Sequence, residues 1–167
     1  MKEHFALMAQ YNTWANVRLY RMAGQLSDEQ YRRDVGAYFK SLHGTLNHLL
    51  AADRIWLRRL TGTGVAPTRL DATLCEGLAE LTEARRAEDE RLLGFVEKLS
   101  DEQLEATIDY HTLNGSLQQQ KLRELLAHLF NHQTHHRGQA HSILTAVGVK
   151  EPESLDVLMM LRERAAR

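Results

Sequence analysis

The chain has 167 residues, a length that predicts a single domain over residues 1–167. Of these residues, 43% are hydrophobic and 26% are charged, which excludes a disordered or collagen-like protein. The 21 lysines and arginines balance 22 aspartates and glutamates, so the basic surplus typical of nucleic-acid-binding proteins is missing, as is any apolar run long enough to span a membrane. The only cysteine, Cys75, cannot form an internal disulfide, and the N-terminal segment lacks the apolar core of a signal peptide, so we expect a cytoplasmic protein.

Four long segments carry apolar residues at the spacing of an amphipathic helix. Glycines favour the ends of three of them, at Gly24, Gly62 and Gly148. The fold class predicted is therefore all-α, a bundle of four antiparallel helices with long connections and a short C-terminal helix. The predicted long helices cover about residues 3–23, 40–60, 74–99 and 120–147, and the short one lies near residues 154–164.

The segment between the third and fourth helices has a different pattern. Ile108, Tyr110 and Thr112 alternate with other residues, and Asn114-Gly115 follows them. Asn-Gly between alternating runs is the strongest short signal for a β-hairpin, because both residues tolerate the positive φ of its turn. We therefore predict a two-stranded hairpin at about residues 106–119.

One five-residue sequence occurs twice. Leu26–Gln30 and Leu99–Gln103 are identical, and each copy lies between two long helices. Ser-Asp-Glu-Gln is a common helix-start sequence, so the repeat indicates either two capped turns or a duplicated helix pair.

Six of the nine histidines lie in the fourth helical segment or just before it. His128, His132 and His136 are four residues apart and therefore form a ladder on one side of the helix. His132 and His136 fall within the apolar stripe. One buried histidine is usually satisfied by a hydrogen bond to a polar neighbour. Two or three stacked imidazoles favour metal binding instead, because imidazoles at i and i+4 can reach one cation.

A metal site on this ladder needs a third ligand from another helix, and His48 is the best candidate. It lies midway along the second helix, beside the apolar stripe and among small neighbours. His43 and His4 are expected on the surface, and Cys75 is a poor fourth ligand because it precedes a different helix. Three histidines leave an open coordination position, which is typical of catalytic rather than structural metal sites.

Several polar residues are candidates for orienting the ligand histidines. Asp53 lies within the apolar stripe of the second helix, where an unpaired carboxylate would be costly. Gln139 and His128 lie at the edge of the histidine stripe, and His128 is also a candidate fourth ligand. Arg85 and Asp89 interrupt the stripe of the third helix, and the alternative for them is a simple i, i+4 ion pair.

Two classes of function are disfavoured. The sequence from His132 to His136 lacks the glutamate that acts as general base in HExxH metalloproteases. Arg54, Arg58 and Arg59 cluster on the second helix, with Arg32-Arg33 nearby. At a net charge of −1, a solvated basic face explains this cluster better than a nucleic-acid site.

Three motifs stand out: Tyr11-Asn12-Thr13-Trp14-Ala15-Asn16, His48-Leu49-Leu50 with Asp53 and Trp56, and Asn131-His132 with His136-Arg137-Gly138-Gln139. Together they resemble the DinB family, the bacterial DinB/YfiT-like group of metal-dependent hydrolases and thiol transferases, which is unrelated to the DNA polymerase of the same name. The resemblance covers nearly the whole chain, and the motif ending in His-Arg-Gly-Gln is the most specific.

The resemblance implies a four-helix bundle that holds a divalent metal through His48, His132 and His136, the same three residues that the helix periodicity selects. Zinc and nickel are the first choices for this divalent transition metal. The resemblance also implies that Trp14 and Asn16 pack the first helix against the bundle. It gives Arg137 a role in orienting its helix or contacting an acidic ligand, with a surface salt bridge as the alternative.

Two functions follow from the resemblance. In the first, the chain is an enzyme in which the metal activates a low-molecular-weight thiol, or water, for transfer to an electrophile. In the second, it is a non-catalytic stress-response protein with a structural metal. The resemblance also points to a homodimer as one option, since members of the family are often homodimeric.

Overall fold

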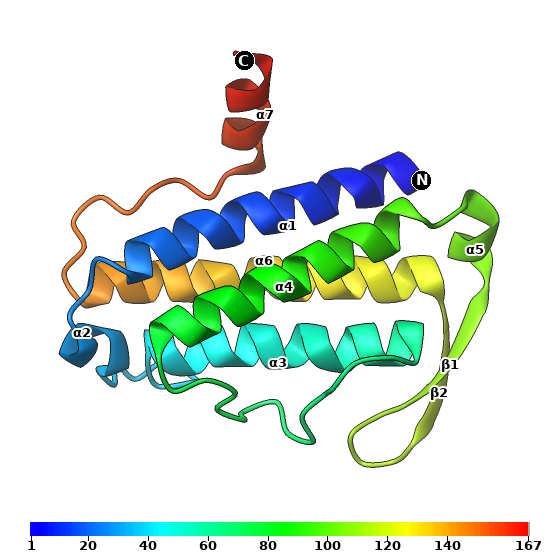
Figure 1. The fold of residues 1–167 in the computed structure, drawn as a ribbon, viewed down its shortest axis with the longest axis horizontal. Helices are drawn as coiled ribbons and strands as arrows, with labels where there is room; N and C mark the ends of the chain where they lie inside the picture. The colour runs from blue at the N-terminus through cyan, green and yellow to red at the C-terminus, as the bar shows by residue number, and fades with distance from the viewer. Residues whose placement is uncertain (167) are drawn as a thin grey trace.

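The computed structural model describes residues 1–166 and confirms the predicted all-α bundle. Four long helices lie side by side (Figure 1): α1 (Lys2–Ala23), α3 (Leu42–Thr61), α4 (Leu78–Glu97) and α6 (Leu122–Ala146). Helix α1 packs against α4 and α6, and α3 packs against the same two helices. The diagonal pairs of the bundle are therefore α1 with α3 and α4 with α6.

The direction of the helices differs in part from the prediction. Figure 1 shows that α1 and α6 run one way through the bundle and that α3 and α4 run the other way. The antiparallel arrangement therefore holds for α1 beside α4 and for α3 beside α6, whereas α3 beside α4 is parallel. Parallel neighbours need a connection that returns along the helix, which for 20 residues is about 30 Å. Residues 62–77 form this connection.

Local hydrogen bonds explain the helix boundaries. Ser41 caps α3 by accepting a hydrogen bond from the backbone of Gly44, and Gly62 ends the helix in the left-handed conformation, with φ 71°. The third long helix begins at Leu78, later than predicted. The reason is that Leu74 and Cys75 donate their backbone N–H groups to the Asn47 side chain, at 2.7 and 3.0 Å.

The connections contain the predicted small elements. The repeated sequence starts two short helices, α2 (Asp28–Arg32) and α5 (Asp101–Glu105), each with a complete capping box. Capping therefore accounts for the repeat. The C-terminal helix α7 (Val157–Ala165) is also present.

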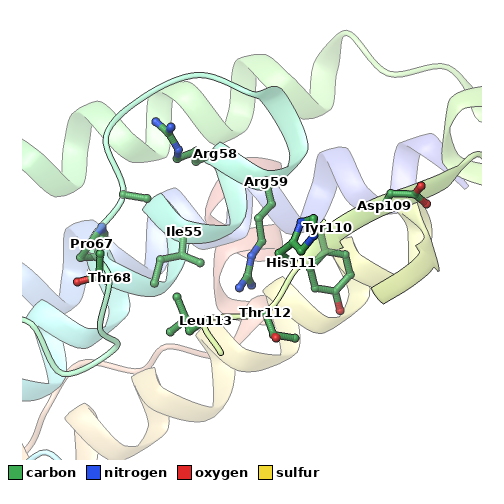
Figure 2. A pocket seen from close by; sticks show the side chains of 11 residues that line it. Ile55, Arg58, Arg59, Pro67, Thr68, Asp109, Tyr110, His111, Thr112 and Leu113 are labelled. Carbon is green, nitrogen blue, oxygen red and sulfur yellow. The ribbon is translucent and has the colours of Figure 1, made fainter. Parts of the chain in front are cut away.

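The predicted hairpin is confirmed and runs two residues further than expected. Its antiparallel strands are β1 (Thr107–His111) and β2 (Leu117–Lys121), joined by a turn in which Gly115 has φ 86°. Because β2 continues to Lys121, α6 begins at Leu122 rather than 120. The end of β1 and the turn lie beside the C-terminal half of α3 (Figure 2), where the Tyr110 ring lies 5.3 Å from that of Trp56.

The interior of the bundle has apolar ends and a polar centre. One apolar cluster contains Leu19, Leu46 and Leu144, and a second contains Leu57 and Leu126. Between them lies a layer of buried polar side chains, termed the polar layer: Asn12, Asn16, Asp53, Arg85, Asp89, Gln133 and Arg137. No helix among residues 1–166 is both long enough and apolar enough to cross a membrane.

Candidate metal centre

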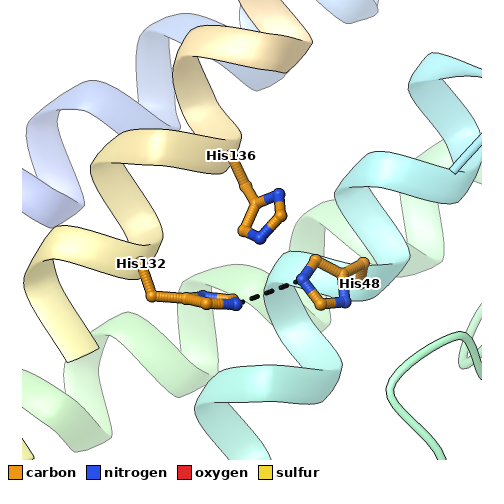
Figure 3. Close-up of side chains that lie close together, drawn as sticks. All are labelled: His48, His132 and His136. Carbon is orange, nitrogen blue, oxygen red and sulfur yellow. Dashed lines mark hydrogen bonds between the residues drawn. The ribbon is translucent and has the colours of Figure 1, made fainter. Parts of the chain in front are cut away.

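The structure brings together the three histidines that the sequence selects. His48 comes from α3, whereas His132 and His136 come from α6. The rings of His132 and His136 point toward the ring of His48 (Figure 3). Each ring offers a nitrogen, and these nitrogens all lie within 4.8 Å of one another. Among residues 1–166, no other cluster of histidine, cysteine or carboxylate side chains meets the same geometric requirement.

The separation of the rings fits a metal ion. In a tetrahedral zinc site with Zn–N distances of about 2.0–2.1 Å, two ligand nitrogens lie about 3.3 Å apart. The Nε2 atoms of His48 and His132 are 3.3 Å apart. An imidazole donor set suits zinc, nickel, copper and iron alike. The residues therefore fit a divalent transition metal without specifying which one.

The ring of His48 is held in place from two sides. Its side chain is buried, with 3% exposure, and its Nδ1 lies 2.9 Å from the backbone carbonyl oxygen of Leu70. Because a carbonyl only accepts, Nδ1 carries the proton, and the lone pair of Nε2 can accept a hydrogen bond from Nε2 of His132 or bind a metal in its place. The ring of Phe39 stacks on the imidazole, with 3.9 Å between the ring centroids.

Gln139 performs the same task for His136. The Nδ1 of His136 donates to Oε1 of Gln139 at 2.7 Å, which leaves Nε2 free to face the other two rings. This contact spans one turn of α6 and places Gln139 where it orients the ring of His136.

Burial keeps the three imidazoles neutral at physiological pH. Burial lowers the pKa of His48 to about 4, and burial together with the neighbouring His136 lowers the pKa of His132 to about 3. Burial also lowers the pKa of His136, against the opposing effect of its hydrogen bond to Gln139. Metal ions bind neutral imidazole, so these shifts favour coordination near pH 7.

The polar layer fixes the spacing of the two helices that carry the histidines. Gln133, next to His132 in the chain, donates from Nε2 to the backbone oxygen of Leu49, next to His48, at 3.0 Å. The same Nε2 donates to Oδ1 of Asp53 at 2.6 Å. Asp53 therefore acts on the histidines only through Gln133, since it has no direct contact with them among the interactions of residues 1–166.

The rest of the polar layer extends to the other two helices. Arg85 pairs with Asp53 at 2.8 Å and with Asp89 at 3.0 Å, so the predicted i, i+4 pair is confirmed and a second ion pair joins it. Burial raises the pKa of Asp53 to about 6 against the opposing effect of Arg85. Asp89 accepts hydrogen bonds from Asn12 and Asn16, each at 3.0 Å, which connects α4 to α1.

Arg137 belongs to this layer and not to the surface. Its side chain is 1% exposed, donates to the side-chain oxygen of Asn12, and lies over the ring of Tyr11 at 5.1 Å. It therefore holds α6 against α1, on the side of the helix away from His48. The alternative of a surface salt bridge is wrong, because the helix face that carries Arg137 is covered by α1.

The first-helix residues behave differently from each other. Asn16 is buried and holds α1 to α4 through Asp89, as the resemblance implies. The indole of Trp14 is half-buried and donates to Glu163 of α7 at 3.0 Å. Trp14 thus packs α1 against the C-terminal helix instead of the centre of the bundle.

The remaining histidines and Cys75 lie outside the cluster. The ring of His128 lies 5.9 Å from that of His132, one turn away along α6. His43 contacts the backbone oxygen of Cys75 at 3.2 Å and is partly buried, whereas His4 is exposed. Cys75 is buried, which raises the pKa of its thiol, and it does not join the histidine group.

A cleft of about 490 Å³ gives access to the histidines. The three rings form one wall, and Tyr38, Phe39 and Asp71 complete it. This volume lies within the range of small-molecule sites, so an open coordination position here can be reached from outside.

Sequence reasoning missed two residues of this site. The Leu70 carbonyl is a backbone group in the irregular connection 62–77, and no side-chain pattern marks it. Phe39 lies before α3, outside any helical periodicity. Both positions depend on the path of loops, which the spacing of apolar residues does not specify.

The fold and site define a class of protein, the helical bundles that carry a histidine cluster on facing helices. The chain belongs to the DinB family, which it matches over residues 1–164. It is 30% identical over 149 residues to the protein named DinB of Bacillus subtilis strain 168, and the match covers 83% of each chain.

Two solved structures share the fold. A DinB-like protein from Bacillus cereus superposes with a TM-score of 0.67 at 19% identity, covering 88% of this chain and 94% of that one. A DinB-like protein from Bacillus subtilis superposes with a TM-score of 0.65 at 17% identity, covering 89% of this chain and 97% of that one.

Proposed function

We propose that this chain binds a divalent transition metal, zinc or nickel foremost, through His48, His132 and His136, and uses it to activate a small thiol or water. The observation that carries the proposal is the convergence of three neutral imidazoles within 4.8 Å beside an open cleft. When bound, the metal supplies a Lewis acid that lowers the pKa of a thiol or water at its open position.

The chain's own residues supply positioning. Leu70 and Gln139 fix the tautomers of two histidines, and Gln133 sets the spacing between their helices. Phe39 covers one ring of the centre and limits access of water from that side. A thiol in the cleft would lose its proton, form a sulfur–carbon bond with an electrophile and release the leaving group with its electron pair.

Elemental analysis of protein without a histidine tag is the first test. About one zinc or nickel ion per chain is expected, with loss of the metal in His48→Ala and His132→Ala. The exposed residue His4 gives a matched control, since His4→Ala should retain the metal. Equal metal content in all four proteins would contradict the ligand assignment.

Activity is tested with glutathione and monochlorobimane. Sulfur replaces chloride in this reaction, and the fluorescent conjugate reports turnover. The metal-loaded protein should accelerate the reaction, and His132→Ala should not. Unchanged turnover in His132→Ala would contradict the proposal.

A structural metal is the second candidate, because the ligands come from two different helices and a bound ion would connect α3 to α6. Removal of the metal would then lower the melting temperature strongly, with no turnover of any thiol. Activity of the loaded protein would exclude this alternative.

The proposed partners are a small thiol and an electrophile, without nucleic acid. Three of the basic residues near the surface of α2 and α3 pair with carboxylates: Arg32 with Asp28, Arg33 with Glu29, and Arg54 with Glu88. These pairs neutralise the face that would otherwise attract phosphates. Binding of duplex DNA that weakens with added salt would contradict this part of the proposal.

A further inference from the structure

A second pocket continues from the histidine cluster toward the hairpin. It has a volume of about 480 Å³ and shares His132 and Leu70 with the cleft of the metal centre. Its walls are mainly apolar and aromatic, and its far end is formed by Trp56, Arg59 and Tyr110. A molecule that reaches the histidines can therefore extend along this pocket as far as the hairpin.

Arg59 lies at the far end, where its planar group contacts two aromatic rings that also contact each other. Its guanidinium carbon is 4.6 Å from the ring centroid of Trp56 and 5.2 Å from that of Tyr110. Cation–π contacts of this kind hold the guanidinium without using its N–H donors as hydrogen bonds to a protein acceptor. Figure 2 shows the side chain directed into the space beside Thr112 and Leu113.

The charge of Arg59 has no anionic partner within residues 1–166. None of its nitrogens makes a hydrogen bond or an ion pair with the described part of the chain. Partial burial lowers the pKa of Arg59, and the only opposing charge effect comes from the Tyr110 phenol. A half-buried guanidinium without a carboxylate is costly, unless a ligand supplies the missing charge.

The neighbouring arginines are satisfied by the protein itself. Arg54 pairs with Glu88 at 3.9 Å, and Arg58 donates to the backbone oxygen of Gly64. In Figure 2, Arg58 points away from the hairpin residues, whereas Arg59 points toward them. The prediction of a solvated basic face is therefore wrong for Arg59, which the hairpin partly covers.

We propose that Arg59 binds the carboxylate of an elongated ligand whose other end reaches the histidine cluster. This inference rests on the proposed function and names its substrate class, an acid that carries the reacting group and the carboxylate at opposite ends. The guanidinium of Arg59 lies beside Trp56, which follows His48 by eight residues on α3. Eight residues correspond to a rise of about 12 Å, and this distance sets the approximate length of the ligand.

A carboxylate fits this place better than other anions. The edge of a guanidinium forms two parallel hydrogen bonds to the two oxygens of a carboxylate. One carboxylate balances the single charge of Arg59, while a doubly charged phosphate would leave a surplus charge against the aromatic wall.

The test compares octanoate with octanamide, which has the same shape and no charge. Binding of each to the metal-free protein is measured by isothermal titration calorimetry. Octanoate should bind about tenfold more tightly than octanamide, since charge-assisted hydrogen bonds are the stronger ones. In Arg59→Gln this ratio should fall to about one, and in Arg59→Lys, which keeps the charge but not the planar fork, it should fall partly.

Arg58→Gln is the matched control, because Arg58 is the adjacent arginine and has its own partner. It should keep the preference for octanoate. A purely structural role of Arg59 would weaken both probes equally and leave the ratio unchanged. A ratio near one in the wild type, or an unchanged ratio in both Arg59 variants, would overturn the proposal. So would binding of octyl phosphate more than tenfold tighter than that of octanoate.

A second pair of probes separates this inference from the metal proposal. In the zinc-loaded protein, 8-mercaptooctanoate should bind more tightly than octanoate, because its thiol reaches the histidine cluster. If the octanoate preference depends on Arg59 but the thiol adds nothing, the carboxylate site stands and the proposed metal chemistry fails.

Discussion

The hydrogen bond between His136 and Gln139 allows a quantitative test of the metal centre. The substitution Gln139→Leu removes the acceptor of Nδ1 and keeps a side chain of similar size. In the wild type, this 2.7 Å bond fixes both the tautomer and the orientation of the ring. Without it, His136 can turn or adopt the other tautomer, and its Nε2 lone pair is no longer held toward the other rings.

The expected loss is large enough to measure. Partners that orient a metal-ligating histidine are worth about 10- to 100-fold in affinity, or about 1.4–2.7 kcal/mol. At a metal concentration 100 times the wild-type Kd, binding stabilises the wild type by about 2.7 kcal/mol. The same concentration is only 1 to 10 times the Kd of the variant, so the stabilisation falls to about 0.4–1.4 kcal/mol.

Two assays report this difference. Competition with a zinc chelator gives the Kd directly. Thermal unfolding with and without metal gives the linked effect: for a chain of this length, 1 kcal/mol changes Tm by about 2–4 °C. The rise in Tm on adding metal should therefore be about 5–11 °C for the wild type and about 1–6 °C for Gln139→Leu.

Gln119→Leu serves as the control, because this glutamine bonds to Asp109 in the hairpin and is remote from the histidines. Its Kd should equal that of the wild type. Gln139→Glu keeps an acceptor and should bind metal at least as tightly as the wild type. A Kd for Gln139→Leu within threefold of the wild-type value would contradict this prediction, since the acceptor would then contribute much less than the expected 10- to 100-fold.

Three further predictions concern stability. Arg85→Met should lower the free energy of unfolding, measured by urea titration, by about 3–5 kcal/mol, because it leaves two buried carboxylates unpaired. The control Arg86→Met, at an exposed position, should change this free energy little. Because the pKa values of His48 and His132 are lowered to about 4 and 3 in the folded chain, the unfolded chain takes up more protons below about pH 6.5. The metal-free protein should therefore lose stability relative to its His132→Asn variant as the pH falls from 6.5 to 4, and a constant difference in urea titrations would contradict this. Gly115→Ala should destabilise the hairpin by about 1 kcal/mol, since φ is 86° there, and unaltered amide exchange in the hairpin would count against it.

The histidine pair on α6 could be predicted because it depends only on local geometry. Residues four apart on a helix share a face whatever surrounds them, so His132 and His136 must lie close together on any helix that contains both. His48 required one more inference, that a polar residue beside an apolar stripe faces the next helix. Both steps use the helical period alone, and the structure brings the three rings together.

The helical period shows which residues share a face of a helix but not what covers that face. This limit explains the remaining differences between the sequence prediction and the structure. Arg137 lies one residue from His136, on a face that the sequence could not assign to solvent or to another helix, and α1 covers it. Arg58 and Arg59 look equivalent in the sequence, yet only Arg59 lies beside the hairpin. The carbonyl of Leu70 reaches His48 because of the path of the 62–77 connection, which no periodic pattern encodes.

The polar layer shows why the stability of the bundle and the geometry of the site are coupled. Buried ion pairs such as that of Asp53 with Arg85 add little net stability compared with apolar residues of the same volume, because both charges lose their hydration. Removal of one partner is nevertheless costly, so the layer disfavours relative placements of the four helices that separate these partners. Since Gln133 binds both Asp53 and the backbone of Leu49, a sliding of α6 against α3 would break the layer before it could separate the histidines. The charges at the centre of the bundle therefore hold the three histidines in position.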